Sequence, residues 1–106
     1  MSVIAFVSMV PIGKEESVSS YVARVVDIVD RSGLDYVLTP MGTIMEGESW
    51  DDVMEVIKRG FEALKEDCRR VDVFIKIDYR EGRSKGIVNK LKSVENKMGR
   101  DIKRVI

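Results

Sequence analysis

Residues 71–79 read VDVFIKIDY and decide the fold class, because apolar and polar side chains alternate along them. A period of two residues is typical of a β-strand with one face toward a core. Phe74 is the one apolar side chain on the face shared by Asp72, Lys76 and Asp78. Residues 3–11 read VIAFVSMVP, with Ser8 as the one polar side chain, and this near-continuous apolar run indicates a strand buried on both faces.

Helical patterns lie between and after these strands. Apolar side chains recur every three or four residues along 17–32, 49–68 and 87–98, which predicts three amphipathic helices. Ser17 and Ser49 are the expected N-caps of the first two helices, because a serine hydroxyl accepts a hydrogen bond from an early helical N–H group.

Two short strands are expected at 36–39 and 43–46, around the Pro-Met-Gly turn at 40–42. The element order is then β-α-β-β-α-β with an additional C-terminal helix. This order predicts an α+β fold of the ferredoxin-like kind, a four-stranded antiparallel sheet with two helices on one face. We expect one domain over residues 1–106, with the first and last strands adjacent in the sheet.

The second face of this sheet would carry exposed apolar side chains. Ile4, Phe6 and Val10 share it on the first strand, and Phe74 joins them from the last strand. Apolar patches of this size usually mark interfaces. We therefore expect the sheets of two copies to pack face to face, giving a homodimer or a homotetramer built as a dimer of dimers.

Composition excludes several classes of enzyme. The chain has 106 residues, no histidine and one cysteine, Cys68. It therefore lacks a Ser-His-Asp triad, a Cys/His zinc site and an internal disulfide. Cys68 falls on the apolar stripe of the second helix, so we expect a buried thiol. We predict no catalytic residues, no metal site and no required cofactor, and hence a binding or structural module.

The formal net charge is zero but unevenly distributed. Residues 1–79 carry 9 basic and 15 acidic side chains, whereas residues 80–106 carry 9 basic and 3 acidic ones. A basic tail can bind nucleic acid or complement an acidic body. No aromatic side chains interleave with the basic ones, so we favour the second interpretation and expect no nucleic-acid partner.

The N-terminal apolar run is interpreted as a strand and not as a signal peptide. No basic residue precedes it, and no small-residue cleavage site follows it. No run of 18 apolar residues exists that would predict a membrane span. Together with the single cysteine, these features predict a cytoplasmic protein without a membrane partner.

Several polar side chains could bind a ligand. Glu46 closes a strand, where no helix dipole explains a carboxylate, so it is the better ligand candidate than the acids at the start of the second helix. Ser8 needs a hydrogen-bond partner, which is either a ligand or neighbouring main chain. Thr39 and Thr43 flank the turn, and their hydroxyl groups could likewise bind either a ligand or neighbouring main chain. Tyr36 could stack on a ring of the ligand.

Lys76 and Asp78 lie on one strand face, two residues apart. A buried lysine can act as a catalytic base or nucleophile. No acid–base partner is recognisable in the sequence, so we favour a structural or intersubunit salt bridge.

Four segments together resemble the small thiamine-binding protein family. They are Val10–Gly13, Ser19–Val22, Met41–Gly47 and Lys76–Arg80, and the resemblance extends over nearly the whole chain. The Met-Gly-Thr-x-x-Glu segment at 41–46 is the most specific of them. The resemblance implies a ferredoxin-like fold, assembly into tetramers through the sheets, and binding of thiamine or its hydroxymethyl-pyrimidine moiety without catalysis.

The chemistry of thiamine is compatible with the candidate residues. Its positive thiazolium suits a carboxylate or an aromatic face, and its flat aminopyrimidine suits hydroxyl groups beside apolar walls. The expected ligand-binding residues are Ser8, Tyr36, Thr39, Thr43 and Glu46.

Three other functions compete with thiamine binding. A small regulatory or structural oligomerisation module needs only the apolar sheet face. An acylphosphatase-like hydrolase needs an arginine in a phosphate-binding loop, and Gly13-Lys14 is a poor substitute. RNA binding through the sheet needs exposed aromatic residues on the central strands, where only Phe6 and Phe74 qualify.

Overall fold

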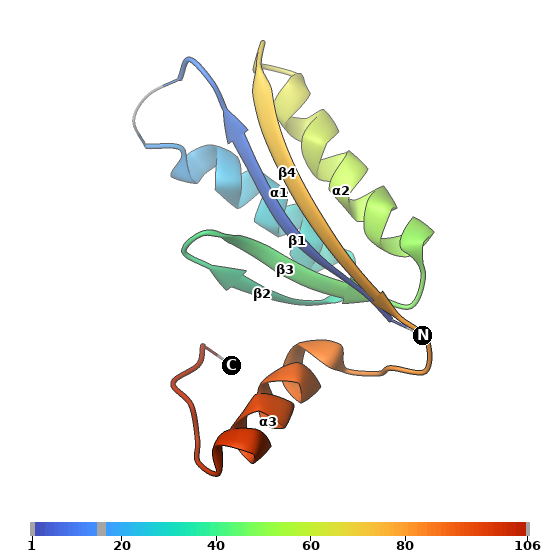
Figure 1. The fold of residues 1–106 in the computed structure, drawn as a ribbon. Helices are drawn as coiled ribbons and strands as arrows, with labels where there is room; N and C mark the ends of the chain where they lie inside the picture. Colours follow the sequence, from blue (N-terminus) through green and yellow to red (C-terminus); the bar gives the residue numbers. More distant parts are fainter. Residues whose placement is uncertain (1, 15–16, 106) are drawn as a thin grey trace.

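The computed structural model describes residues 2–14 and 17–105. The elements follow the expected order, with an additional helix at the C-terminal end (Figure 1). Their bounds are β1 Ser2–Pro11, α1 Ser19–Arg31, β2 Asp35–Thr39, β3 Gly42–Gly47, α2 Trp50–Lys65, β4 Val71–Arg80 and α3 Gly86–Met98.

The four strands form one antiparallel sheet in the order β2-β3-β1-β4. The first and last strands are therefore neighbours, and the two long strands pair from Ser2 opposite Arg80 to Pro11 opposite Val71. This arrangement confirms the expected ferredoxin-like α+β fold.

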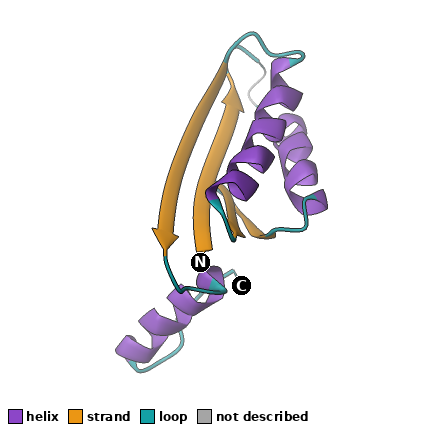
Figure 2. Ribbon diagram, turned by 90° about the vertical axis from the view of Figure 1, so that its right-hand side faces the viewer, coloured by secondary structure: helices purple, strands orange, loops and turns teal. Residues whose placement is uncertain are grey.

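Helices α1 and α2 cover one face of the sheet, and the core lies between them and β1 (Figure 2). The alternate side chains of β1 that point to this face are all buried, as the sequence pattern predicts. The buried apolar residues of the core are Val3, Ala5, Val7, Met9, Val25, Val29, Met45, Val53, Val56, Ile57, Leu64 and Cys68. The buried thiol of Cys68 confirms the interpretation of this residue.

The predicted N-caps have different outcomes. The N–H group of Asp52 donates to the Ser49 hydroxyl at 3.1 Å, which confirms Ser49 as the cap of α2. The expectation for Ser17 is wrong, because Val18 is the N-cap residue of α1 and makes no side-chain cap bond. The Val18 carbonyl accepts the first helical N–H groups, so Ser17 lies one residue too early.

Helix α3 stands apart from the two-layer body. Figures 1 and 2 show it beyond one end of the sheet, away from α1 and α2. The radius of gyration is 15.0 Å, whereas a compact chain of this length has about 13 Å. Val88, Val94 and Met98 of α3 are exposed. The position of α3 therefore depends on a few specific contacts made by its N-terminal half.

Candidate functional site

A cavity of about 510 Å³ lies between the open sheet face, α3 and the segment that follows α3. Small-molecule sites usually occupy about 300–1,000 Å³. The lining is apolar on β1, β2 and β3 and carries charged groups on β4, α3 and the C-terminal segment. The lining residues are Ile4, Phe6, Val37, Ile44, Lys76, Asp78, Ile87, Lys90, Leu91, Ile102, Lys103, Arg104 and Val105.

One row of side chains crosses all four strands and forms part of the cavity floor. Val37 of β2 lies opposite Ile44 of β3. Ile44 in turn lies opposite Phe6 of β1, and Phe6 lies opposite Lys76 of β4. The row is therefore apolar on three strands and ends in an ammonium group on the fourth.

The ring of Phe6 is held from two sides. An added Cβ at Gly42 would come within 2.6 Å of Phe6 Cζ, so the ring occupies space that only glycine leaves free. Phe74 meets Phe6 edge to face, with 6.1 Å between ring centroids and an interplanar angle of 75°. Such contacts give Phe6 a defined orientation beside the cavity.

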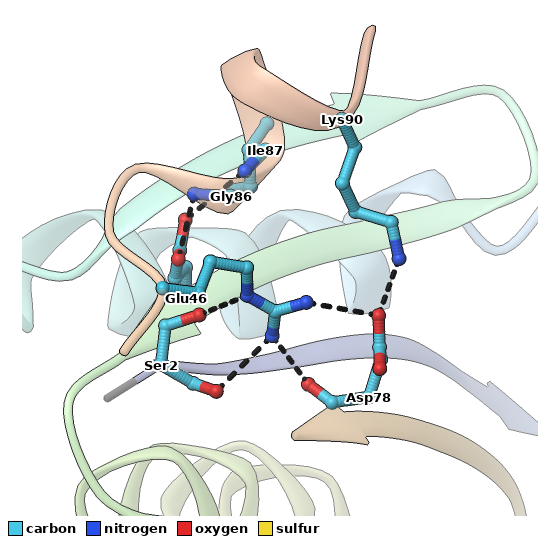
Figure 3. Close-up of polar contacts among 7 residues, drawn as sticks. Ser2, Glu46, Asp78, Gly86, Ile87 and Lys90 are labelled. Carbon is cyan, nitrogen blue, oxygen red and sulfur yellow. Dashed lines mark hydrogen bonds and ion pairs between the residues drawn. The ribbon is translucent and has the colours of Figure 1, made fainter. Parts of the chain in front are cut away.

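The first turn of α3 is attached to the sheet by Glu46. The Gly86 N–H group donates to Glu46 Oε2 at 2.8 Å, and the Ile87 N–H group donates to Oε1 at 3.1 Å (Figure 3). The residue before them, Lys85, adopts left-handed φ and ψ angles of 47° and 46° and provides no side-chain cap. Glu46, distant in sequence, therefore caps this helix.

The environment of Glu46 keeps it ionised. Burial raises the pKa of its carboxyl group, but the hydrogen bonds from Gly86 and Ile87, the Ser2 hydroxyl and the nearby Arg83 charge together lower the pKa below its ordinary value. The expectation that no helix dipole acts on Glu46 is wrong. The dipole that acts on Glu46 is that of α3, which is distant in sequence and contacts β3 only in the folded structure.

Arg83 also attaches the loop before α3 to the sheet, through β1 and β4. Its guanidinium donates to Asp78 Oδ2 at 3.0 Å, to the Asp78 carbonyl at 2.7 Å and to the Ser2 carbonyl at 3.1 Å. Its Nε–H group also donates to the Ser2 hydroxyl. The Arg83 side chain is 8% exposed. This buried network holds the loop before α3 against the ends of β1 and β4.

Asp78 is the carboxylate of the cavity lining, and cations already surround it. Lys90 of α3 donates to the same Oδ2 atom that accepts from Arg83. Hydrogen bonds from Lys90 and then from Arg83 lower the pKa of Asp78 below its ordinary value. The predicted salt bridge of Asp78 thus forms with these two residues, and Lys76 has no ion-pair partner within the described part of the chain.

The five predicted ligand-binding residues do not gather at this cavity. Register places Ser8, Thr39 and Glu46 on the open face, and it places Tyr36 and Thr43 on the face that the helices cover. Ser8, Thr39 and Thr43 line a separate hollow of about 180 Å³ near the β2–β3 turn. This volume is below the usual range for small-molecule sites.

Three of the five make contacts within the fold. The Tyr36 hydroxyl donates to Asp30 Oδ1 at 2.7 Å, and this hydrogen bond raises the pKa of Tyr36. The Thr39 hydroxyl donates to the Gly42 carbonyl at 2.8 Å and so closes the turn. Glu46 caps α3. Thr43 is buried, and the Ser8 hydroxyl forms no hydrogen bond with other described residues.

Sequence reasoning assigned Ile4 and Phe6 to an interface and did not select the remaining lining residues as a site. Alternation and strand order could have grouped Val37 and Ile44 with Phe6. No local signal places Arg83 beside Ser2, because 81 residues separate them in the chain.

Two site classes find no support among the residues described. No group of three or more His, Cys, Asp and Glu side chains at residues 2–14 and 17–105 could hold a metal ion. Over the same ranges, none of the helices has the length and apolar character needed to cross a membrane.

Comparison with known proteins places this geometry in context. A family profile described as thiamine-binding protein matches residues 5–95. UPF0045 protein Mb1933 of Mycobacterium bovis is 36% identical over 95 residues, covering 90% of this chain and 93% of that protein. UPF0045 protein MJ1052 of Methanocaldococcus jannaschii is 34% identical over 92 residues, covering 87% of this chain and 91% of that protein.

Solved structures show the same fold. A crystal structure of MJ1052 has a TM-score of 0.81 at 33% identity, covering 88% of this chain and 95% of that one. A Thermotoga maritima protein described as a candidate thiamine biosynthesis/salvage protein has a TM-score of 0.77 at 22% identity, covering 89% and 99% of the two chains.

Proposed function

Because the chain belongs to the thiamine-binding protein family, we propose that it binds thiamine or the hydroxymethyl-pyrimidine part of thiamine in the cavity beneath α3. The observation that carries this proposal is the form of the cavity, which has about 510 Å³ of space over an apolar floor. A flat heteroaromatic ring matches such a floor, because it buries two apolar faces while its polar edge reaches charged groups.

Phe6 is the residue expected to meet the ring of the ligand. Its side chain is half-buried, lies in the lining and is held by Phe74 and by the space above Gly42. Aromatic pairs stabilise contact beyond the area they bury. A positioned aromatic ring between two aliphatic neighbours, Ile4 and Ile44, therefore provides a surface for the pyrimidine.

We propose binding without catalysis. Among the described residues, the lining contains no histidine, cysteine, serine or tyrosine, and the one carboxylate among them, Asp78, accepts from two cations. A general base must be free to accept a proton at the reacting atom, and Asp78 in this state is not. Neither the family description nor the name of the mycobacterial relative includes a catalytic activity.

We also propose that the protein self-associates through its open face, as a dimer or a dimer of dimers. Phe74 on this face is 58% exposed, and Val94 and Met98 on α3 are exposed as well. Burying such side chains against a second copy is favourable by the hydrophobic effect. Sedimentation showing a stable monomer at micromolar concentration would contradict this part of the proposal.

Titration calorimetry with thiamine and with hydroxymethyl-pyrimidine tests the binding. We expect heat with at least one compound and about a tenfold weaker affinity after Phe6→Leu, since an aromatic pair contributes about 0.5–1.5 kcal/mol beyond its buried area. Trp50→Leu is the matched control, because Trp50 is an exposed aromatic residue of α2 that lies outside the lining. Absence of heat and of thermal stabilisation with both compounds would overturn the proposal.

The same titration separates binding from the alternative of a purely structural oligomerisation module. That alternative is favoured only by the exposed apolar residues of the open face and α3. It predicts self-association with no response to either compound. Binding that depends on Phe6 and not on Trp50 would exclude a purely structural module as the whole function.

A further inference from the structure

We propose that the ligand of this cavity carries a phosphate monoester, bound by the ammonium groups of Lys76 and Lys103. The proposal concerns the anionic part of the ligand and rests on the proposed function for the aromatic part. In chemical terms, the preferred ligand is a phosphate ester of thiamine or of its pyrimidine alcohol. The free alcohol would occupy the same floor with lower affinity.

The charge of the lining opposes a cationic ligand. Its described residues include four basic side chains, Lys76, Lys90, Lys103 and Arg104, and one acidic side chain, Asp78. Asp78 accepts from Lys90 within the cavity and from Arg83 beside it, so its negative charge is already balanced. In the part of the lining that the structure describes, the positive thiazolium of thiamine therefore has no free carboxylate to pair with, whereas an anionic substituent has an excess of cations.

Two of the four cations have no carboxylate partner. Lys90 pairs with Asp78, and Arg104 lies 3.6 Å from Glu95 through Nη1 and Oε1. Lys76 and Lys103 form no ion pair within the described part of the chain. A phosphate monoester carries close to two negative charges at neutral pH, so it matches these two ammonium groups, whereas a carboxylate would balance only one.

The cross-strand row of the cavity floor orients the ligand in the proposed complex. The cross-strand row runs from Val37 through Ile44 and Phe6 to Lys76. A ring lying on the apolar part of this row directs a substituent along it toward the Lys76 ammonium group. Lys103 reaches the same cavity from the segment after α3. The aromatic ring of the ligand would thus contact the apolar part of the row, and its anionic group would contact the neighbouring Lys76.

This arrangement also accounts for the uneven charge of the chain. Residues 80–106, which carry 9 basic and 3 acidic side chains, contain three of the four cations of the lining. Folding places α3 and the following segment beside the open face, so three of these nine basic side chains line a cavity of bounded volume. A small anion fits this placement better than an extended polyanion.

Titration calorimetry of the full chain at low and at moderate salt tests the proposal. We expect the monophosphate ester of thiamine to bind about tenfold more tightly than thiamine at low salt, because each partly exposed ion pair contributes a few-fold. Added salt should reduce this preference. Lys76→Gln and Lys103→Gln should each reduce the preference for the ester, while each variant binds thiamine as tightly as the wild type or more tightly. Lys92→Gln removes the same charge from α3 outside the lining and should change nothing.

Phenyl phosphate separates the two proposals. If thiamine binds and its ester binds equally or more weakly, the phosphate site is overturned and the proposed function stands. If thiamine, hydroxymethyl-pyrimidine and the phosphate esters of both fail but phenyl phosphate binds in a Lys76-dependent manner, the cationic site stands and the proposed function is overturned. If none of these compounds binds, both proposals are overturned. A phosphate preference that survives in both Lys76→Gln and Lys103→Gln would overturn the assignment to these residues.

Discussion

Replacing Glu46 by glutamine tests whether this single carboxylate holds α3 in place. In the structure both carboxylate oxygens accept backbone N–H groups of the first turn, from Gly86 at 2.8 Å and from Ile87 at 3.1 Å. The residue is 8% exposed, so water replaces these bonds poorly. Glutamine keeps one acceptor but turns its NH₂ group toward an N–H donor, and it removes the charge that faces the helix dipole.

The size of the effect follows from these contacts. A hydrogen bond to a charged group contributes about 1.5–3 kcal/mol, and a charge near a helix N-terminus contributes about 0.3–1 kcal/mol. We expect Glu46→Gln to weaken the docking of α3 by about 2 kcal/mol, which is about 30-fold in the equilibrium between docked and undocked helix. The global unfolding of the sheet and of α1 and α2 should change less, because α3 lies outside their core.

Amide hydrogen exchange, expressed as protection factors, measures this directly. Protection of α3 should fall about 30-fold in Glu46→Gln, while protection of β1 stays close to that of the wild type. Glu48→Gln is the matched control, since Glu48 is exposed and its substitution removes the same charge at a position two residues away. Equal protection of α3 in Glu46→Gln and wild type, or an equal loss in Glu48→Gln, would refute the reasoning.

The pH dependence of the same measurement has a defined sign. The folded protein holds the pKa of Glu46 below its ordinary value of 4.5. The ionised form is therefore the one that stabilises the docked helix, so the stabilisation is complete above pH 4.5 and is lost as the pH falls through the lowered pKa. Protection of α3 should decline in acid in the wild type, and this decline should be smaller in Glu46→Gln.

Three further predictions follow from contacts elsewhere in the fold. Gly42→Ala should lower the free energy of unfolding by about 1–3 kcal/mol. The new Cβ would lie 2.6 Å from Phe6 Cζ and 2.8 Å from a backbone carbonyl oxygen. An unchanged midpoint of urea unfolding would contradict this steric argument. Arg24→Gln should raise the pKa of Asp67 from about 2 toward 3.8, because the Arg24 hydrogen bond is the largest cause of the lowered value. The stabilisation from Asp67 is then lost at a higher pH as the solution is acidified, and an NMR titration of this carboxyl group that still gave a midpoint near 2 would disprove the assignment. Lys85→Gly should strengthen the docking of α3 by about 0.5–1 kcal/mol, because Lys85, the residue before this helix, has φ 47° and left-handed backbone is unfavourable for residues with a Cβ. Amide protection of α3 below that of the wild type would show that the side chain matters more than the backbone.

Local patterns predict most of the fold of this chain. The alternation over 71–79 and the apolar run over 3–11 place side chains correctly on two sheet faces, because the strand period of two is a property of the backbone itself. Ser49 caps α2 as expected, since its partner is only three residues away. Ser17 fails as a cap because the first helical carbonyl belongs to Val18, and a serine cluster does not specify which residue that will be.

The candidate site is less accessible to such reasoning. Its place at the end of a strand predicts Glu46 as a ligand-binding residue, yet the observed partners of Glu46 lie 40 and 41 residues further along the chain, at the start of α3. The motif at 41–46 contributes Ile44 to the cavity and leaves space at Gly42 for the ring of Phe6, instead of providing its polar side chains. Only the register of the strands shows which members of a motif share a face.

The sequence by itself therefore determined the order of elements, the two faces of the sheet, the apolar character of the open face and the basic excess of residues 80–106. Tertiary structure decided where α3 lies, which side chains enclose the cavity and which charges remain unpaired. The physical reason is the range of the interactions. Periodicity and caps act within a few residues, whereas the contacts of Arg83 and Glu46 join segments whose proximity exists only after the sheet has formed.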